Sequence, residues 1–218
     1  MDGSTSRSLS IANPSETNLT ATVLDLEQRT LLLTAANTGS GTSTSALAFA
    51  SQLALMSAGP VLLVDSNGGS GSGTSLSQQL GLHKLRGFTD LLFNQDTPPL
   101  AQDCIVRLSD QPFDVLPAGI YKRGRDRLSP DLLRVLLAQL SSHYRFVVID
   151  GEAVYASADS LVIGTLVDGV ILVICAEETR WEVAQATAQR LTQAGAQLIG
   201  SVFNRRKYYM PKWLYNNL

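Results

Sequence analysis

The sequence lacks the clusters of cysteine and histidine that build disulfide frameworks and zinc sites. Its 218 residues include two cysteines, Cys104 and Cys175, and two histidines, His83 and His143, each isolated along the chain. Two lone cysteines are typical of a protein from a reducing compartment. We expect neither a structural disulfide nor a zinc site, because zinc ligands occur at close, regular spacings.

The chain also lacks an excess of charge of either sign. It has 17 Lys and Arg against 19 Asp and Glu, which gives a formal net charge of −2. Proteins that bind nucleic acid usually carry a basic excess that attracts and neutralises phosphates. The composition therefore gives no support for a nucleic-acid partner.

No long hydrophobic run is present. The longest, 46–58, is interrupted by Ser51 and Gln52 and falls short of the roughly 18–20 residues that a membrane-spanning helix needs. The start of the chain is rich in Ser, Thr and Asn and has no apolar core like that of a secretory signal. We expect a disordered segment over residues 1–22 and a cytoplasmic protein, held at the inner face of the membrane only through a partner.

What the sequence does contain is a regular alternation of short apolar runs and helical segments. The predicted strands are 30–35, 61–65, 113–116, 145–150, 169–176 and 197–203. The predicted helices between them are 43–57, 77–82, 89–93, 130–143, 156–166 and 181–194. This alternation predicts an α/β domain with a doubly wound, mostly parallel sheet flanked by helices.

The loop after the first predicted strand follows the phosphate-binding pattern with one major change. The P-loop pattern is G-x-x-x-x-G-K-[ST] between a strand and a helix. Here Ala36 stands at the first glycine and Thr42 at the lysine, while Gly41 and Ser43 match. The candidate nucleotide-binding residues of this loop are Gly39, Ser40, Gly41, Thr42, Ser43 and Thr44.

The missing lysine should affect nucleotide binding less than phosphoryl transfer. Backbone N–H groups and the start of the helix can still attract an anion. Loss of the lysine charge should cost about 1.5–3 kcal/mol of binding energy, and more in the transition state. Nucleotide binding can survive such a loss, whereas fast phosphoryl transfer needs another cation. On the loop alone, the alternative is a Gly/Ser-rich loop without a ligand.

Further motifs, in a fixed order, resemble a known family. The loop is followed by strands that end in Asp65 and Asp150 and by the terminal Asn204. Between them lie GFTDLL at 87–92, FDVLPAG at 113–119 and DGVILV at 168–173. Together they resemble the ParA/MinD-type P-loop ATPases, and especially the bacterial tyrosine-kinase (BY-kinase) domains of exopolysaccharide synthesis, with a degenerate Walker A motif. The resemblance implies a P-loop NTPase-like domain over 23–206, followed by a basic and aromatic tail over 207–218.

The resemblance also implies a site for ATP or ADP with Mg²⁺. Ser43 would coordinate the magnesium, Asp65 would be the catalytic acid near the magnesium and the attacking group, and Asp150 would hold the magnesium through water. Asn204 would lie at the adenine edge. A few carboxylates with phosphate oxygens and water are the ligands Mg²⁺ prefers. For each acid, the alternative is a polar strand end that caps a neighbouring helix.

The departures from the family pattern all weaken catalysis. Besides Thr42, Asn67 replaces the second acid of a D-x-D motif, glycines and a serine at 68–71 replace a basic stretch, and Gly151-Glu152-Ala153 replaces Thr-Pro-Pro. No E-x-x-R-x-x-R oligomerisation helix is found near the start. We interpret the chain as a catalytically impaired, BY-kinase-like regulator of exopolysaccharide synthesis or export, with weak or no nucleotide binding.

Two alternatives stay open. The chain could be an active ATPase or tyrosine autokinase that takes a substitute cation from Arg205, Lys122 or a neighbouring subunit, with Tyr208, Tyr209 and Tyr215 as acceptors. It could also be a scaffold that binds no nucleotide. ParA-like proteins of bacterial cellulose synthesis resemble this chain in carrying Thr at the lysine position, so the change need not abolish binding. The partner implied is a membrane-bound chain-length, synthase or export component, or a second copy of the chain.

Overall fold

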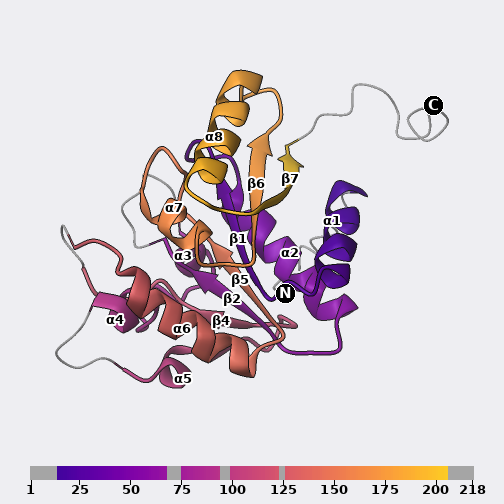
Figure 1. Ribbon diagram of the computed structural model, residues 1–218. Helices are drawn as coiled ribbons and strands as arrows, with labels where there is room; N and C mark the ends of the chain where they lie inside the picture. Colours follow the sequence, from indigo (N-terminus) through magenta and orange to yellow (C-terminus); the bar gives the residue numbers. More distant parts are fainter. Residues whose placement is uncertain (1–13, 68–74, 94–98, 123–125, 206–218) are drawn as a thin grey trace, which may run out of the picture.

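The computed structural model describes residues 14–67, 75–93, 99–122 and 126–205 (Figure 1). The glycine-rich 68–71, part of the cationic run 122–127 and the tail with Tyr208, Tyr209 and Tyr215 lie outside the described residues. Within the described ranges, no helix has the length and hydrophobicity to cross a bilayer.

All of the predicted strands and helices are present, and α1, α5 and β3 are additional. The strands are β1 Thr30–Ala35, β2 Val61–Asp65, β3 Val106–Arg107, β4 Asp114–Leu116, β5 Phe146–Asp150, β6 Gly169–Cys175 and β7 Leu198–Asn204. The helices are α1 Pro14–Asp25, α2 Thr42–Met56, α3 Leu76–Gln79, α4 Phe88–Phe93, α5 Ala101–Cys104, α6 Pro130–His143, α7 Asp159–Gly164 and α8 Trp181–Gln193.

The strands form one sheet in the order β3-β4-β2-β5-β1-β6-β7. All pairs are parallel except β3 with β4, which is antiparallel. The predicted doubly wound, mostly parallel architecture is confirmed. The order places β5 between β2 and β1, so the loops that follow these three strands leave the same edge of the sheet side by side. Ligands of such folds bind at this carboxyl edge.

Each face of the sheet has its own hydrophobic cluster. Alternate residues of β1 belong to different clusters. Leu31 and Leu33 pack toward α1 and α2, while Leu32 packs toward α6, α7 and α8. The two sets of helices lie on opposite sides of the sheet in Figure 1. A strand buried on both faces must be apolar at every position, which explains the uninterrupted hydrophobic runs of the sequence.

Helix α1 corrects the prediction of a disordered segment over 1–22 for its residues 14–22. Residues 14–25 form a helix in which Leu19 and Val23, four residues apart, are buried with the α2 side of the core. The Thr20 hydroxyl donates to Gln52 of α2 at 2.9 Å. Gly200 of β7 leaves room for Leu19, because a Cβ there would lie 2.7 Å from a Leu19 methyl group. The folded unit therefore begins before residue 23.

Candidate functional site

The loop between β1 and α2 turns sharply into the helix. Gly39 and Gly41 have φ of 83° and 86°, a left-handed conformation that glycine adopts without strain. Gly41 directly precedes α2, and no side chain caps the first turn of this helix. The N–H groups of that turn have no acceptor within the helix, so they present a positive end to the loop. This backbone can hold an anion such as phosphate.

Asn204, at the end of β7, braces this loop. Its side-chain amide donates to the Ser40 carbonyl at 3.0 Å, and its side-chain oxygen accepts from the Arg205 N–H at 2.9 Å. A Cβ on Gly41 would lie 1.8 Å from the same amide nitrogen. Sequence reasoning identified Asn204 for adenine, and that role stays a prediction. The bracing contact was missed, because nothing in the sequence pairs β7 with residue 40.

Asp150 is the buried acid of the site. Its register places it beside Asp65 of β2 and Leu33 of β1. It has no exposed surface, and neither carboxylate oxygen has a hydrogen-bond partner of good geometry among the described residues. Burial and the neighbouring Asp65 raise the pKa of Asp150 to about 8, while the Ser43 hydroxyl opposes part of this rise. Ser43 and Asp150 therefore interact, and their role as magnesium ligands stays a prediction.

An unpartnered buried carboxyl is unfavourable unless something in the functional state pairs with it. Mg²⁺ satisfies such a group, with the Ser43 hydroxyl as a second oxygen ligand and phosphate and water completing its shell. The described ranges contain no group of three or more His, Cys, Asp or Glu side chains that could hold a metal without such help. The residues present thus fit a nucleotide-bound magnesium better than a metal held by protein alone.

Asp65 has a different environment, because its oxygens already have partners. One accepts from the Asn67 N–H at 3.0 Å, and the other accepts from the N–H and hydroxyl of Ser77 at 2.8 and 2.6 Å. Burial raises the pKa of Asp65 and these hydrogen bonds oppose the rise. Since Ser77 lies in the first turn of α3, the contacts are those of a helix-capping acid. This favours the alternative weighed for Asp65, and its role at magnesium stays a prediction.

The two motifs at 87–92 and 113–119 hold the loops around the site. The N–H groups of Phe88 and Thr89 donate to the carbonyls of Pro117 and Ala118, both at 2.8 Å. The Asp90 carboxylate accepts from the N–H groups of Gly87 and Ile120, both at 2.9 Å. The Ala118 N–H also donates to the Ser77 hydroxyl at 2.8 Å. These motifs therefore position the loop after β4 and, through Ser77, Asp65.

The cations considered as substitutes for the lysine lie at the surface. Lys122 and Arg205 are both exposed. Arg205 lies 3.4 Å from Glu178, and both side chains are more than half exposed. Neither forms an ion pair with Asp65 or Asp150 among the described contacts. The sequence prediction of a substitute cation is thus untested for a bound state.

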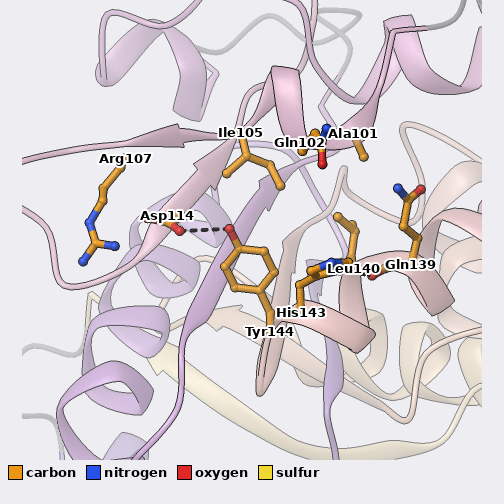
Figure 2. Close-up of a pocket in the computed structure, with 9 residues that line it drawn as sticks. All are labelled: Ala101, Gln102, Ile105, Arg107, Asp114, Gln139, Leu140, His143 and Tyr144. Atoms are coloured by element: carbon orange, nitrogen blue, oxygen red, sulfur yellow. Dashed lines mark hydrogen bonds between the residues drawn. The ribbon is translucent and has the colours of Figure 1, made fainter.

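A cavity of about 220 Å³ lies elsewhere, at the amino ends of the parallel strands (Figure 2). Tyr144, just before β5, reaches across it and donates its hydroxyl to Asp114 of β4 at 2.9 Å. Burial and Asp114 raise the pKa of this phenol. The other lining residues are Ala101, Gln102, Ile105, Arg107, Gln139, Leu140 and His143. The cavity is separate from the phosphate-loop edge, and sequence reasoning did not identify it.

Comparison with known proteins gives relatives of one kind. No family model matches the chain. It is 25% identical to the tyrosine-protein kinase YwqD of Bacillus subtilis over 192 residues. The alignment covers 88% of this chain and 78% of YwqD. It is 26% identical to the tyrosine-protein kinase Etk of Escherichia coli over 86% of this chain, but this match spans only 25% of Etk.

Solved structures agree with the sequence relatives. The kinase domain of VpsO is 28% identical with a TM-score of 0.71, and the match covers 88% of this chain and 96% of that domain. The septum site-determining protein MinD of Pyrococcus horikoshii, complexed with Mg-ADP, shares the fold at 20% identity and a TM-score of 0.63, over 87% and 76% of the two chains. These matches extend over most of the chain.

Proposed function

Because the homologues of this chain are bacterial tyrosine-kinase domains and its fold is that of P-loop ATPases, we propose that it is a catalytically impaired, BY-kinase-like protein. It regulates exopolysaccharide synthesis or export through protein contacts and binds nucleotide weakly or not at all. The observation that carries this proposal is Thr42, which stands at the lysine position of the P-loop pattern, directly after the left-handed Gly41 that precedes α2.

Electrostatics supports the assignment. A transferred phosphoryl group carries negative charge on its oxygens, which the P-loop lysine and magnesium neutralise in related enzymes. In this chain Thr42 offers a hydroxyl instead, and the buried side chains at the ends of β2 and β5 are the acids Asp65 and Asp150. Backbone N–H groups remain to bind phosphate, but no buried cation among the described residues stabilises charge that develops during transfer.

Magnesium with ADP or ATP is the ligand that we propose for the loop between β1 and α2. Ser43 and Asp150 would hold the metal, and the loop of Gly39 to Gly41 would hold the phosphates. Bound magnesium would supply neutralisation of the phosphate oxygens. Asp150 would then lose its proton to the solvent and act as a ligand of the metal or as a hydrogen-bond acceptor for its water. Nucleotide binding would then regulate the contacts of the protein with its partner, and the nucleotide would not be hydrolysed.

The partner that we propose is a membrane-bound chain-length, synthase or export component, contacted from the cytoplasmic side. The proposal rests on the likeness to tyrosine kinases of exopolysaccharide synthesis. A second copy of the chain is the other partner to test.

The experiment compares the wild type with Thr42→Lys in equilibrium binding of Mg-ATP and in ATP turnover. We expect the added lysine to tighten binding by about 10- to 150-fold, which corresponds to about 1.5–3 kcal/mol. Gln193→Lys is the matched control, because it adds the same charge at the exposed end of α8. It should leave binding unchanged.

Several outcomes would contradict the proposal. Rapid ATP hydrolysis by the wild type, lost in Asp150→Ala, would show an active ATPase. Phosphotyrosine formed on Tyr208, Tyr209 or Tyr215 after incubation with ATP would show an autokinase. No rise in melting temperature with ATP or ADP for either the wild type or Thr42→Lys would favour a scaffold, since a ligand that binds only the native state must stabilise it.

A further inference from the structure

The cavity at the amino ends of the strands has walls that belong to the hydrophobic core (Figure 2). Ala101 of α5 and Leu140 of α6 line it and are only 4% and 3% exposed. Ile105 and Tyr144 also line it, and both pack against the hydrophobic cluster on the α6 side of the sheet. The interior is therefore apolar, with one aromatic ring among its walls. Such walls favour the apolar face of a small molecule.

The ring of Tyr144 is held in place. Its hydroxyl donates to Asp114 at 2.9 Å. Burial and the contact with Asp114 raise the pKa of Tyr144, and the charge of Arg107 opposes part of this rise. The phenol is therefore neutral at physiological pH, with its hydrogen directed at Asp114. A wall that is already fixed loses little freedom when a ligand binds, which favours binding.

The charges around the cavity are balanced. Among the described residues that line it, Asp114 is the one carboxylate and Arg107 the one guanidinium. They are direct cross-strand partners in the antiparallel pair of β3 and β4, an arrangement in which opposite charges attract. A ligand carboxylate near Arg107 would also meet Asp114, and a ligand ammonium near Asp114 would also meet Arg107. The cavity therefore favours an uncharged ligand.

The solvent-facing part of the lining carries amide groups. Gln102 of α5 and Gln139 of α6 line the cavity and are exposed. A carboxamide has two N–H donors and one acceptor oxygen. Within the described ranges neither side-chain amide has a hydrogen-bond partner. A ligand that carries a donor and an acceptor on its edge can pair with these amides without breaking a contact within the protein.

The volume of the cavity sets the size of the ligand. The cavity has about 220 Å³, whereas a protein cavity of roughly 150 Å³ holds benzene. The space therefore fits one ring with a short substituent. A sugar of this size would place hydroxyl groups against the apolar walls, where a hydroxyl without a hydrogen-bond partner is unfavourable. A flat ring with polar groups only at its edge fits better.

We propose that this cavity is a binding site for a small, uncharged heteroaromatic ring with a hydrogen-bond donor and an acceptor on its edge, such as a nucleobase or a ring carboxamide. The ring would lie against Tyr144 and Leu140, and its polar edge would pair with Gln102 and Gln139. The site is separate from the phosphate loop, so the inference does not depend on the proposed function. A ligand here and a nucleotide at the loop can be bound at the same time.

The test uses nicotinamide, an uncharged pyridine carboxamide, and nicotinate, its anionic counterpart of nearly the same shape. NMR titration of the isotope-labelled full chain gives dissociation constants and maps the site. A pH of 7.5 keeps most histidine side chains uncharged. We expect nicotinamide to bind in about the millimolar range, as is usual for so small a ligand, with shifts centred on 101–107, 114 and 139–144. Nicotinate should bind at least about fivefold more weakly.

Ala101→Leu tests whether the cavity itself is the site. The larger apolar side chain would occupy the space, because Ala101 is buried and lines it. We expect nicotinamide binding to weaken by at least about tenfold. Ala186→Leu is the matched control, since it makes the same change on the exposed face of α8, and it should leave binding unchanged. Circular dichroism confirms that each variant is folded.

Asp114→Asn tests the charge balance. The variant keeps an acceptor for the Tyr144 hydroxyl but leaves the charge of Arg107 unopposed. We expect its preference for nicotinamide over nicotinate to fall by about fivefold. Glu182→Gln is the control, because it removes an exposed acid in the first turn of α8, and the preference should stay as in the wild type.

Three results would overturn the inference. The first is no nicotinamide binding by the wild type, or shifts centred outside the lining residues. The second is equal or tighter binding of nicotinate by the wild type, which decides the question even where a variant fails to fold. The third is tighter binding of glucose than of nicotinamide at the same residues. Because none of these measurements uses ATP or magnesium, a failure here leaves the proposed function as it stands.

Discussion

Asp150 has the least favourable environment among the described acids of the site, since both of its oxygens are buried without a partner. Its pKa of about 8 lies well above that of an exposed aspartate, first because of burial and then because of Asp65. Between about pH 4 and pH 8 the folded chain therefore holds a proton that the unfolded chain has released. Stability must fall as the pH rises through this window.

We expect Asp150→Asn to remove this loss in the ligand-free protein. The variant should gain on the wild type steadily from pH 5 to pH 8, by about 4 kcal/mol over this range. Urea unfolding at pH 5, 6, 7 and 8, without magnesium or nucleotide, measures the difference. Parallel curves for the two proteins would mean that the carboxyl has a partner in solution.

Gly41 is constrained by both its backbone and its neighbour. We expect Gly41→Ala to destabilise the fold by more than the about 1–2 kcal/mol of a left-handed backbone, because the new methyl group would overlap the Asn204 amide. Gly39→Ala is the matched control, with φ of 83° and no atom within 4 Å of the new Cβ. Chemical denaturation of both variants gives the difference. Equal losses would show that Asn204 moves aside without penalty.

At the scale of elements, the sequence predicted the strands and helices that are marked by a pattern of neighbouring residues. Continuous apolar runs identified the central strands, and Ser129 before Pro130 predicted the start of α6, where the Ser129 hydroxyl caps the helix. Strand β3, with two residues, is too short to leave a pattern. Helix α1 was missed because its polar composition resembles a disordered segment, and its stability comes from packing against α2 and β7.

The docking of α1 can be tested through one side chain. We expect Leu19→Ala to destabilise the protein by about 2–4 kcal/mol, as for other buried leucines, since Leu19 is 7% exposed and fills the space above Gly200. Leu26→Ala, at a position that is 55% exposed, should have little effect. Thermal or urea unfolding compares them. Similar small losses for both would support the predicted disorder for residues 14–22.

At the scale of the whole molecule, the fold class and the position of the site followed from the order of elements, whereas the contacts within the site did not. Parallel strands that alternate with helices place their loops at one edge, which is enough to bring residue 43 near residue 150. The brace by Asn204 and the position of Asp150 beside Asp65 depend on which strands are neighbours. That information arises only when β7 pairs with β6 and β5 lies between β2 and β1.

The tie between Asn204 and Ser40 has a practical consequence for work with this protein. It joins the last described strand to the turn that follows the first, so position 205 lies close to that turn. A fluorophore attached there, through Arg205→Cys, would sit next to the place where a nucleotide is expected. A dye at this position therefore offers a reporter of occupancy.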